Sequence, residues 1–238
     1  MDNSMDQTKV RLPSLYALAD ERSTSAQRIL FRLLGANLAL IVFSSFLSFL
    51  DGESRAIAII QLLTLLSVLA TSLYISNAKL EVTWYGARAL AESVKTVTWR
   101  YAMKAEPFNS DEQASLSAFL GSLQRIIDDN KEISKQVVAL RDGEQVTEWM
   151  RMCRASSLAD RKSLYSLKRI KDQYGWYSLQ ASRNDRRSRI AFWTLVGSNV
   201  LAIVCSVLLV ADPSRVSLPT DVFVAFATAV IAWTQSKR

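Results

Sequence analysis

Four long stretches of this chain contain no charged residue, and aliphatic and aromatic side chains dominate each of them: 33–50, 56–78, 190–211 and 222–236. A helix needs about 20 apolar residues to cross the hydrocarbon core of a bilayer. The first three stretches are about that long. The last can be lengthened to Val216 or can begin at the membrane surface after Pro219. The sequence therefore predicts an all-α membrane protein with four transmembrane helices.

Short polar segments, 51–55 and 212–221, join these helices in pairs, which predicts two helical hairpins. Of the 29 Lys and Arg residues, the two joining segments hold only Arg55 and Arg215. Because cations beside membrane spans stay in the cytoplasm, we expect both termini and the middle region there. The predicted layout is a cytoplasmic N-terminal segment (1–32), a first transmembrane hairpin (33–78), a cytoplasmic helical stalk (79–189), a second transmembrane hairpin (190–236) and a cytoplasmic tail (237–238).

The composition argues against catalysis. The chain has no histidine, so it lacks the imidazole of a Ser-His-Asp triad and of a His-ligated zinc or haem site. Two cysteines, Cys153 and Cys205, are too few for a cysteine metal cluster. Seven Gly and four Pro leave few turns and favour long helices. We expect no catalytic residue, no metal and no cofactor, and hence a protein that is not an enzyme.

The two halves of the chain resemble each other. A shift of 162 residues aligns 33–44 with 195–206 and makes six of the twelve positions identical, including Asn37 with Asn199 and Ser44 with Ser206. This indicates a parallel repeat. Polar residues recur on one side of the apolar helices, at Asn37, Ser44, Ser48, Gln61, Thr64, Asn199 and Ser206. They are candidates either for bonds that pack helix on helix or for the lining of a water-filled pore.

The middle region predicts three helices. The second transmembrane helix continues as one rod to Pro107, another helix runs from about 111 to 140 with Asp142-Gly143 closing it, and a third starts near 144 and reaches the third span with an interruption around Gly175. Four residues at three- and four-residue spacing define the expected buried face of the second helix: Leu116, Leu120, Leu123 and Ile127. The N-terminal stretch 15–18 is expected to pack on these helices or to lie at the membrane surface.

Within the rod, 84–101 places two kinds of residue on opposite faces. The aliphatic face, with Leu90, Val94, Val97 and Tyr101, predicts burial. The other face carries Trp84, Arg88, Glu92, Lys95 and Trp99, followed by Arg100. This face is a candidate interface with another subunit or with the N-terminal segment, a nucleotide sensor in which Trp stacks a base and cations bind phosphate, or a solvated surface.

A second cluster precedes the third apolar stretch, with Trp176, Tyr177, Arg183, Arg186, Arg187 and Arg189. Aromatic and basic residues at this position are typical of contact with the membrane interface and anionic head groups. Nucleic-acid binding is the alternative, but no nucleic-acid-binding motif accompanies the cluster, and we expect none.

Two segments resemble the SLATT family of bacterial two-helix membrane modules: 84–108 (WYGARALAESVKTVTWRYAMKAEPF) and 170–193 (IKDQYGWYSLQASRNDRRSRIAFW). The resemblance implies two modules in tandem in a bacterial cytoplasmic membrane, forming a homo-oligomeric pore or otherwise disrupting the bilayer in antiviral defence. It also implies a partner of the nucleotidyltransferase or SLOG kind that supplies a nucleotide second messenger. The alternative function is a membrane-anchored scaffold that recruits a cytosolic partner through its helical stalk.

Overall fold

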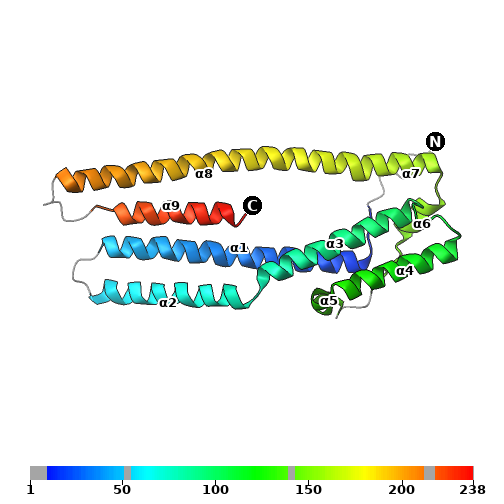
Figure 1. The fold of residues 1–238 in the computed structure, drawn as a ribbon, viewed down its shortest axis with the longest axis horizontal. Helices are drawn as coiled ribbons and strands as arrows, with labels where there is room; N and C mark the ends of the chain where they lie inside the picture. The colour runs from blue at the N-terminus through cyan, green and yellow to red at the C-terminus, as the bar shows by residue number, and fades with distance from the viewer. Residues whose placement is uncertain (1–9, 51–54, 139–142, 212–217, 238) are drawn as a thin grey trace. The chain divides into compact units, whose positions relative to one another are not determined.

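The computed structural model describes residues 10–50, 55–138, 143–211 and 218–237, and every regular element within these ranges is a helix (Figure 1). Most of both joining segments, and the helix end expected at 140–142, lie outside the described residues. Backbone contacts divide the chain into two units, one of Met1–Arg28 with Leu80–Ser178 and one of Ile29–Lys79 with Leu179–Arg238. We call the first the helical body and the second the apolar unit.

The helical body packs short helices around α3. It contains the start of α1 (Ser14–Phe49), α3 (Leu80–Ala102), α4 (Glu112–Asp129), α5 (Lys131–Val138), α6 (Glu148–Ala155), α7 (Leu158–Tyr165), the π-helical segment η1 (Ser166–Lys171) and the start of α8 (Asp172–Ala211). Leu90, Val94 and Tyr101 are buried, which confirms the predicted aliphatic face of α3. Leu15 joins the same core, which confirms that the N-terminal stretch packs on these helices.

Three expectations about helix courses were wrong. The rod expected from the second apolar stretch is interrupted, because α2 (Arg55–Asn77) ends two residues before Lys79, whose φ of 46° is left-handed and incompatible with a helix. The third predicted helix breaks after Ala155 and not at Gly175. There Ser156 donates its backbone N–H to the end of α6, and the Ser157 side chain caps α7.

The helix predicted over 111–140 is also divided, since α4 ends at Asp129 and the backbone N–H of the next residue, Asn130, bonds back to the Ile127 carbonyl. Its buried face is rotated from the predicted one. Phe119 and Ser115 are fully buried with Leu123, whereas Leu120 is 44% exposed. The leucine spacing misled because Phe119, the largest apolar side chain of α4, determines which face turns to the core.

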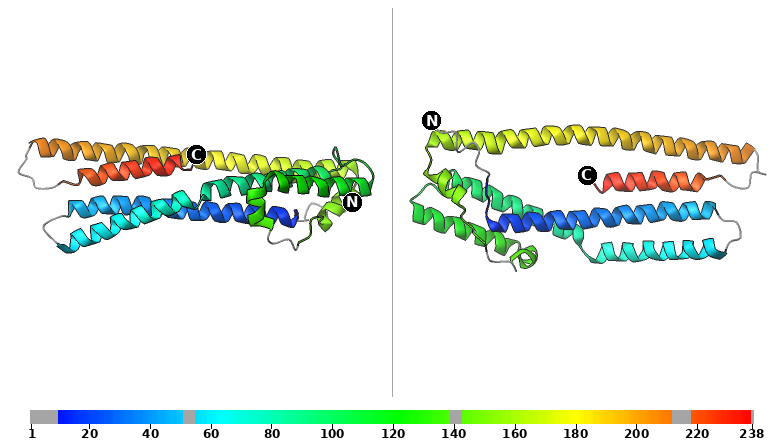
Figure 2. Two further views of the ribbon diagram at one scale, coloured as in Figure 1. Left: turned by 60° about the horizontal axis from the view of Figure 1, so that its bottom comes forward. Right: turned by 180° about the vertical axis from the view of Figure 1, so that it is seen from behind.

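The apolar unit contains the second part of α1, α2, the second part of α8, and α9 (Thr220–Gln235). The views agree that α2 runs beside this part of α1 (Figure 1 and Figure 2). The ring of Trp233 on α9 lies edge-on to Phe31, 5.9 Å between centroids, and 3.5 Å from the position a Cβ would take on Gly35. α9 begins directly after Pro219, as one of the two sequence alternatives expected.

Large apolar side chains of this unit face outward. Leu63 is 58% exposed, Ile203 61% and Val210 82%. Three helices are long and apolar enough to cross a membrane, namely those that contain α1, α2 and α8. α9 has 16 residues and is therefore about 24 Å long, shorter than the roughly 30 Å of a bilayer core.

Candidate functional site: a cation-rich cavity in the helical body

The start of α1 contacts the charged face of α3. Arg88 pairs with Asp20 of α1 at 3.1 Å and with Glu92 at 3.1 Å, and Lys95 lies 3.7 Å from Glu92. The Ser23 hydroxyl donates to the backbone carbonyl of Trp84 at 3.2 Å. This arrangement matches the interpretation of the face as an interface with the N-terminal segment.

Trp99 does not lie on an outer face, and its predicted position opposite the core was wrong. It is 4% exposed, and its ring meets the edges of Trp149 at 5.1 Å and Tyr165 at 5.6 Å. The reason is that α6 and α7 cover a second side of α3, so α3 is buried on more than one side. A helical projection of α3 alone cannot show partners that come from residues fifty or more positions later in the chain.

A cavity of about 350 Å³ opens beside Trp99, between α3 and the helix formed by α7 and η1. Four cations line it: Arg100 from α3, Arg161 and Lys162 from α7, and Arg169 from η1. Tyr165 and several apolar side chains complete the wall. Of the sequence candidates, the cavity therefore brings together Trp99 and Arg100, whereas Trp84, Arg88, Glu92 and Lys95 do not line it.

Three of these cations, Arg161, Lys162 and Arg169, were not predicted to lie at a ligand site. Lys162, Tyr165 and Arg169 recur at spacings of three and four residues, which places them on one helix side. That signal was available in the sequence, but only the fold shows that this side faces Trp99.

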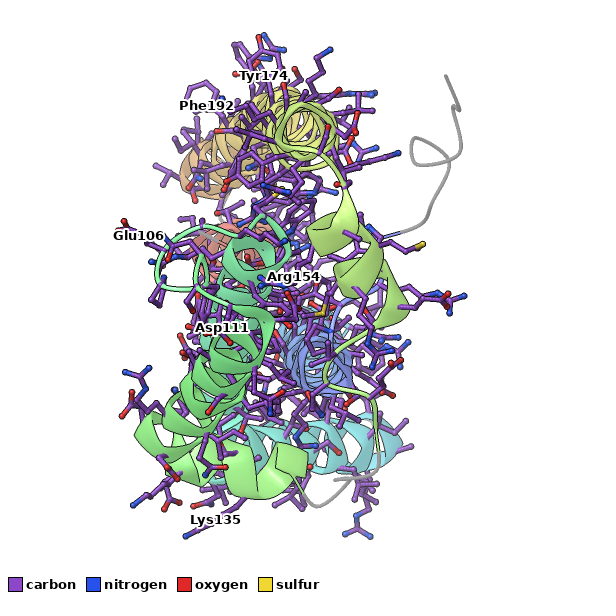
Figure 3. The ribbon with its side chains drawn as sticks, turned by 90° about the vertical axis from the view of Figure 1, so that its right-hand side faces the viewer. Glu106, Asp111, Lys135, Arg154, Tyr174 and Phe192 are labelled. Carbon is purple, nitrogen blue, oxygen red and sulfur yellow. The ribbon has the colours of Figure 1, made fainter. Side chains whose placement is uncertain are left out.

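The second unpredicted feature is a buried arginine that fastens α6 to α3 and α4. Arg154 is 2% exposed. One edge of its guanidinium group, Nε and Nη2, donates to the two carboxylate oxygens of Glu112 at 2.8 and 3.0 Å. On the other side, Nη1 donates to the carbonyls of Tyr101 and Phe108 at 2.6 and 3.3 Å. The guanidinium also lies over the Tyr101 ring, 4.2 Å from its centroid. Figure 3 shows Arg154 within the packed helices, whereas Lys135 projects at their edge.

Burial and charge shift the pKa values of groups in this cluster. The hydrogen bond from Arg154 lowers the pKa of Glu112, while burial raises the pKa of Tyr101. Burial raises the pKa of the neighbouring Cys153 thiol to about 11. Cys153 is 2% exposed, so its thiol is both shielded and protonated at neutral pH.

In the apolar unit, several predicted polar residues bond across the first hairpin. The Asn37 amide donates to the Ser72 hydroxyl at 2.9 Å and to the carbonyl of Val68 at 3.2 Å, and the Gln61 amide donates to the Ser48 hydroxyl at 2.6 Å. We call these contacts between α1 and α2 the Asn37 seam. Thr64 and Ser44 of the same two helices are also buried. The contacts are those of helix packing, the first of the two interpretations of the stripe.

The corresponding residues of α8 are placed differently. Asn199 and Ser206 are exposed, and their side chains donate to carbonyls one turn earlier in their own helix, at 2.9 and 3.0 Å. The residues predicted to contact the membrane interface are also exposed on α8: Trp176, Tyr177, Arg183, Arg186, Arg187 and Arg189. Among the described residues, the structure contains no group of acidic or cysteine side chains that could hold a metal ion.

Two family matches cover nearly the whole chain. Residues 13–162 match the SMODS and SLOG-associating 2TM effector domain 3, and residues 165–238 match the SMODS and SLOG-associating 2TM effector domain 1. No curated protein and no solved structure matches the chain. The first match alone spans more than half of the sequence, and the two follow one another as the internal repeat predicted. The chain therefore belongs to the SLATT family, as two effector domains in tandem.

Proposed function

We propose that this protein is an oligomeric membrane effector that raises membrane permeability when its helical body receives a nucleotide-type signal. The observation that carries the proposal is the combination of two tandem 2TM effector domains with outward-facing apolar side chains on three long helices. In water, such a continuous apolar surface would drive aggregation, whereas lipid solvates it. The association of these domains with SMODS and SLOG partners supports a nucleotide signal and a role in bacterial conflict systems.

The polar residues of α8 favour assembly. In one chain surrounded by lipid, the exposed amide of Asn199 would face hydrocarbon, which is costly for a polar group. A second copy, or water in a pore between copies, removes that cost. Asn37 and Gln61 already have partners within the hairpin. We therefore propose that Asn199 and Ser206 line the conducting path and that the Asn37 seam holds the first hairpin together.

The proposed topology has four spans, both termini in the cytoplasm and the two joining segments outside. It rests on the distribution of Lys and Arg along the sequence. Single cysteines introduced at Gly52 and Ser214, in a chain without its two native cysteines, test it. Both should react with a membrane-impermeant maleimide added from outside the cytoplasmic membrane, and labelling only from the cytoplasmic side would refute the arrangement.

Purified protein in dye-loaded liposomes tests the effector activity. We expect dye release when the vesicles receive extract from cells that contain a SMODS or SLOG partner, and tight vesicles with extract from cells without one. Asn199→Leu should reduce the release while leaving the amount of inserted protein unchanged. Vesicles that stay tight under all of these conditions would refute a pore.

A scaffold function has less support. That alternative relied on an exposed surface between Trp84 and Trp99, but the start of α1 contacts one end of it and Trp99 is buried.

A further inference from the structure

The cavity beside Trp99 holds an excess of positive charge. Four cations line it, Arg100, Arg161, Lys162 and Arg169, and no carboxylate is among its lining residues. Within the described ranges, no carboxylate lies within ion-pair distance of any of them. Elsewhere in the helical body, by contrast, Arg88, Arg151 and Arg154 each face a carboxylate. Like charges gathered around one small space repel one another, so an anion in that space would be strongly favoured.

Two guanidinium nitrogens at this cavity are shielded from water without a partner. Arg161 Nε and Arg169 Nη1 are buried and make no hydrogen bond to the described part of the chain. The Arg161 side chain is held in place, since its Nη1 donates to the Ser156 carbonyl at 2.6 Å, and Arg100 Nη2 similarly donates to the Glu106 carbonyl. Arginine does not lose its proton in proteins, so these two N–H groups remain donors without an acceptor among the described residues. Planar guanidinium groups pair best with phosphate or carboxylate oxygens.

The remaining wall suits a planar, apolar portion of the same ligand. Tyr165 is 37% exposed and is held edge-on to the buried Trp99, while Met103, Leu158 and Ile170 supply aliphatic surface. A volume of about 350 Å³ is at the lower end of that of small-molecule sites. It accommodates one ring with one anionic group and is too small for a large oligonucleotide.

We propose that this cavity binds a soluble phosphate-bearing molecule of the mononucleotide class, with the phosphate at Arg161 and Arg169 and the ring against Tyr165. The inference deepens the proposed function and rests on it for the nucleotide nature of the signal. Because the cavity has α3 on one side and α7 with η1 on the other, a bound phosphate connects these elements. Binding then favours the conformation in which they are close, which is the requirement for a ligand to shift an equilibrium.

Calorimetry on the full-length protein in nanodiscs tests the site, with AMP, adenosine and inorganic phosphate as probes. We expect AMP to bind, inorganic phosphate to bind more weakly, and adenosine not to bind. Arg161→Gln, Arg169→Gln and the exposed Lys162→Gln should each weaken AMP binding about tenfold or more. Arg125→Gln, on an exposed side of α4, should not. Protection of the buried Cys153 thiol from alkylation reports whether each variant is folded, and Lys162→Gln keeps the test valid if the arginine variants unfold.

Several results would overturn the inference. Equal AMP binding by wild type and the folded cavity variants would place the ligand elsewhere, and equal binding of AMP and inorganic phosphate would refute a role for Tyr165. Displacement of inorganic phosphate by vesicles containing phosphatidic acid, without any binding of AMP, would assign the cavity to a lipid phosphate. Dye release separates the two proposals: signal-dependent release that survives Arg161→Gln and Arg169→Gln refutes this site alone, whereas AMP binding without release in any condition refutes the pore alone.

Discussion

The Arg154–Glu112 pair leads to a prediction that depends on which partner is removed. The Arg154 side chain is 2% exposed and the Glu112 side chain 64%. Glu112→Ala leaves a positive charge inside the body, whereas Arg154→Met leaves a carboxylate that water can solvate. Loss of one partner from a fully buried pair costs about 3–5 kcal/mol. Since two backbone carbonyls still accept from Arg154, we expect about 2–3 kcal/mol of destabilisation for Glu112→Ala.

Arg154→Met should cost less, about 1 kcal/mol. Methionine replaces the aliphatic part of the arginine, and both carbonyls that accept from Arg154 retain another donor. The Tyr101 carbonyl also accepts from the Lys104 amide at 3.1 Å, and the Phe108 carbonyl accepts from the Ser115 hydroxyl at 3.1 Å. The double variant should resemble Arg154→Met alone, because loss of Arg154 already leaves Glu112 without its main partner, so that the further removal of Glu112 costs little.

The alkylation rate of Cys153 measures the effect. Its buried, protonated thiol reacts only when the helical body opens. With Cys205→Ala as the background, so that a single thiol remains, 2–3 kcal/mol corresponds to about a 30- to 150-fold faster reaction. Arg154→Met should give about a fivefold increase. Glu132→Ala, which removes an exposed pair with Lys135, should leave the rate unchanged. A larger effect for Arg154→Met than for Glu112→Ala would refute the reasoning.

Three further predictions concern acidity, packing and the seam. Because the pKa of Glu112 is lowered in the folded protein, the stability that Glu112 contributes is complete at a pH above its ordinary pKa of 4.5 and is lost as the pH falls through the lower folded pKa. The difference in Cys153 reactivity between wild type and Glu112→Ala should therefore vanish in strong acid. Reaction with a pyridyl disulfide measures it. Gly86→Ala should destabilise the body by about 1–3 kcal/mol, because a Cβ there would come within 2.7 Å of a side chain of α5, whereas Gly121→Ala meets open space and should not; Cys153 alkylation distinguishes them. Asn37→Ala should cost about 0.5–1.5 kcal/mol in steric-trap unfolding in bicelles, and Asn199→Ala much less; equal losses would contradict the assignment of the seam.

The parts of the fold that depend on local pattern were predictable. Uncharged length located the apolar helices, and the spacing of Leu90, Val94 and Tyr101 identified the core face of α3. One of the two segments that resemble the family, 84–108, also contains Trp99 and Arg100, which line the cavity.

The parts that depend on partners distant in sequence were not predictable. Trp99 looked exposed because its neighbours, Trp149 and Tyr165, come from helices that no pattern in α3 reveals. Arg154 was not among the sequence candidates, although its position one turn after the buried Met150 places it on the buried side of α6. In both cases the deciding information is tertiary packing. The sequence of a single helix does not show how many of its sides other helices cover.

The wider, π-helical turn η1 affects the continuous helix formed by α7, η1 and α8. A π-helical turn holds one residue more than the α-helical ladder on either side. Removing one residue from this turn would restore a regular ladder and swing the next segment by about 100°, so that Trp176 and Tyr177 would point in a new direction relative to Tyr165. The extra residue thus sets the direction in which Trp176 and Tyr177 point around the helix axis, relative to Tyr165 at the cavity.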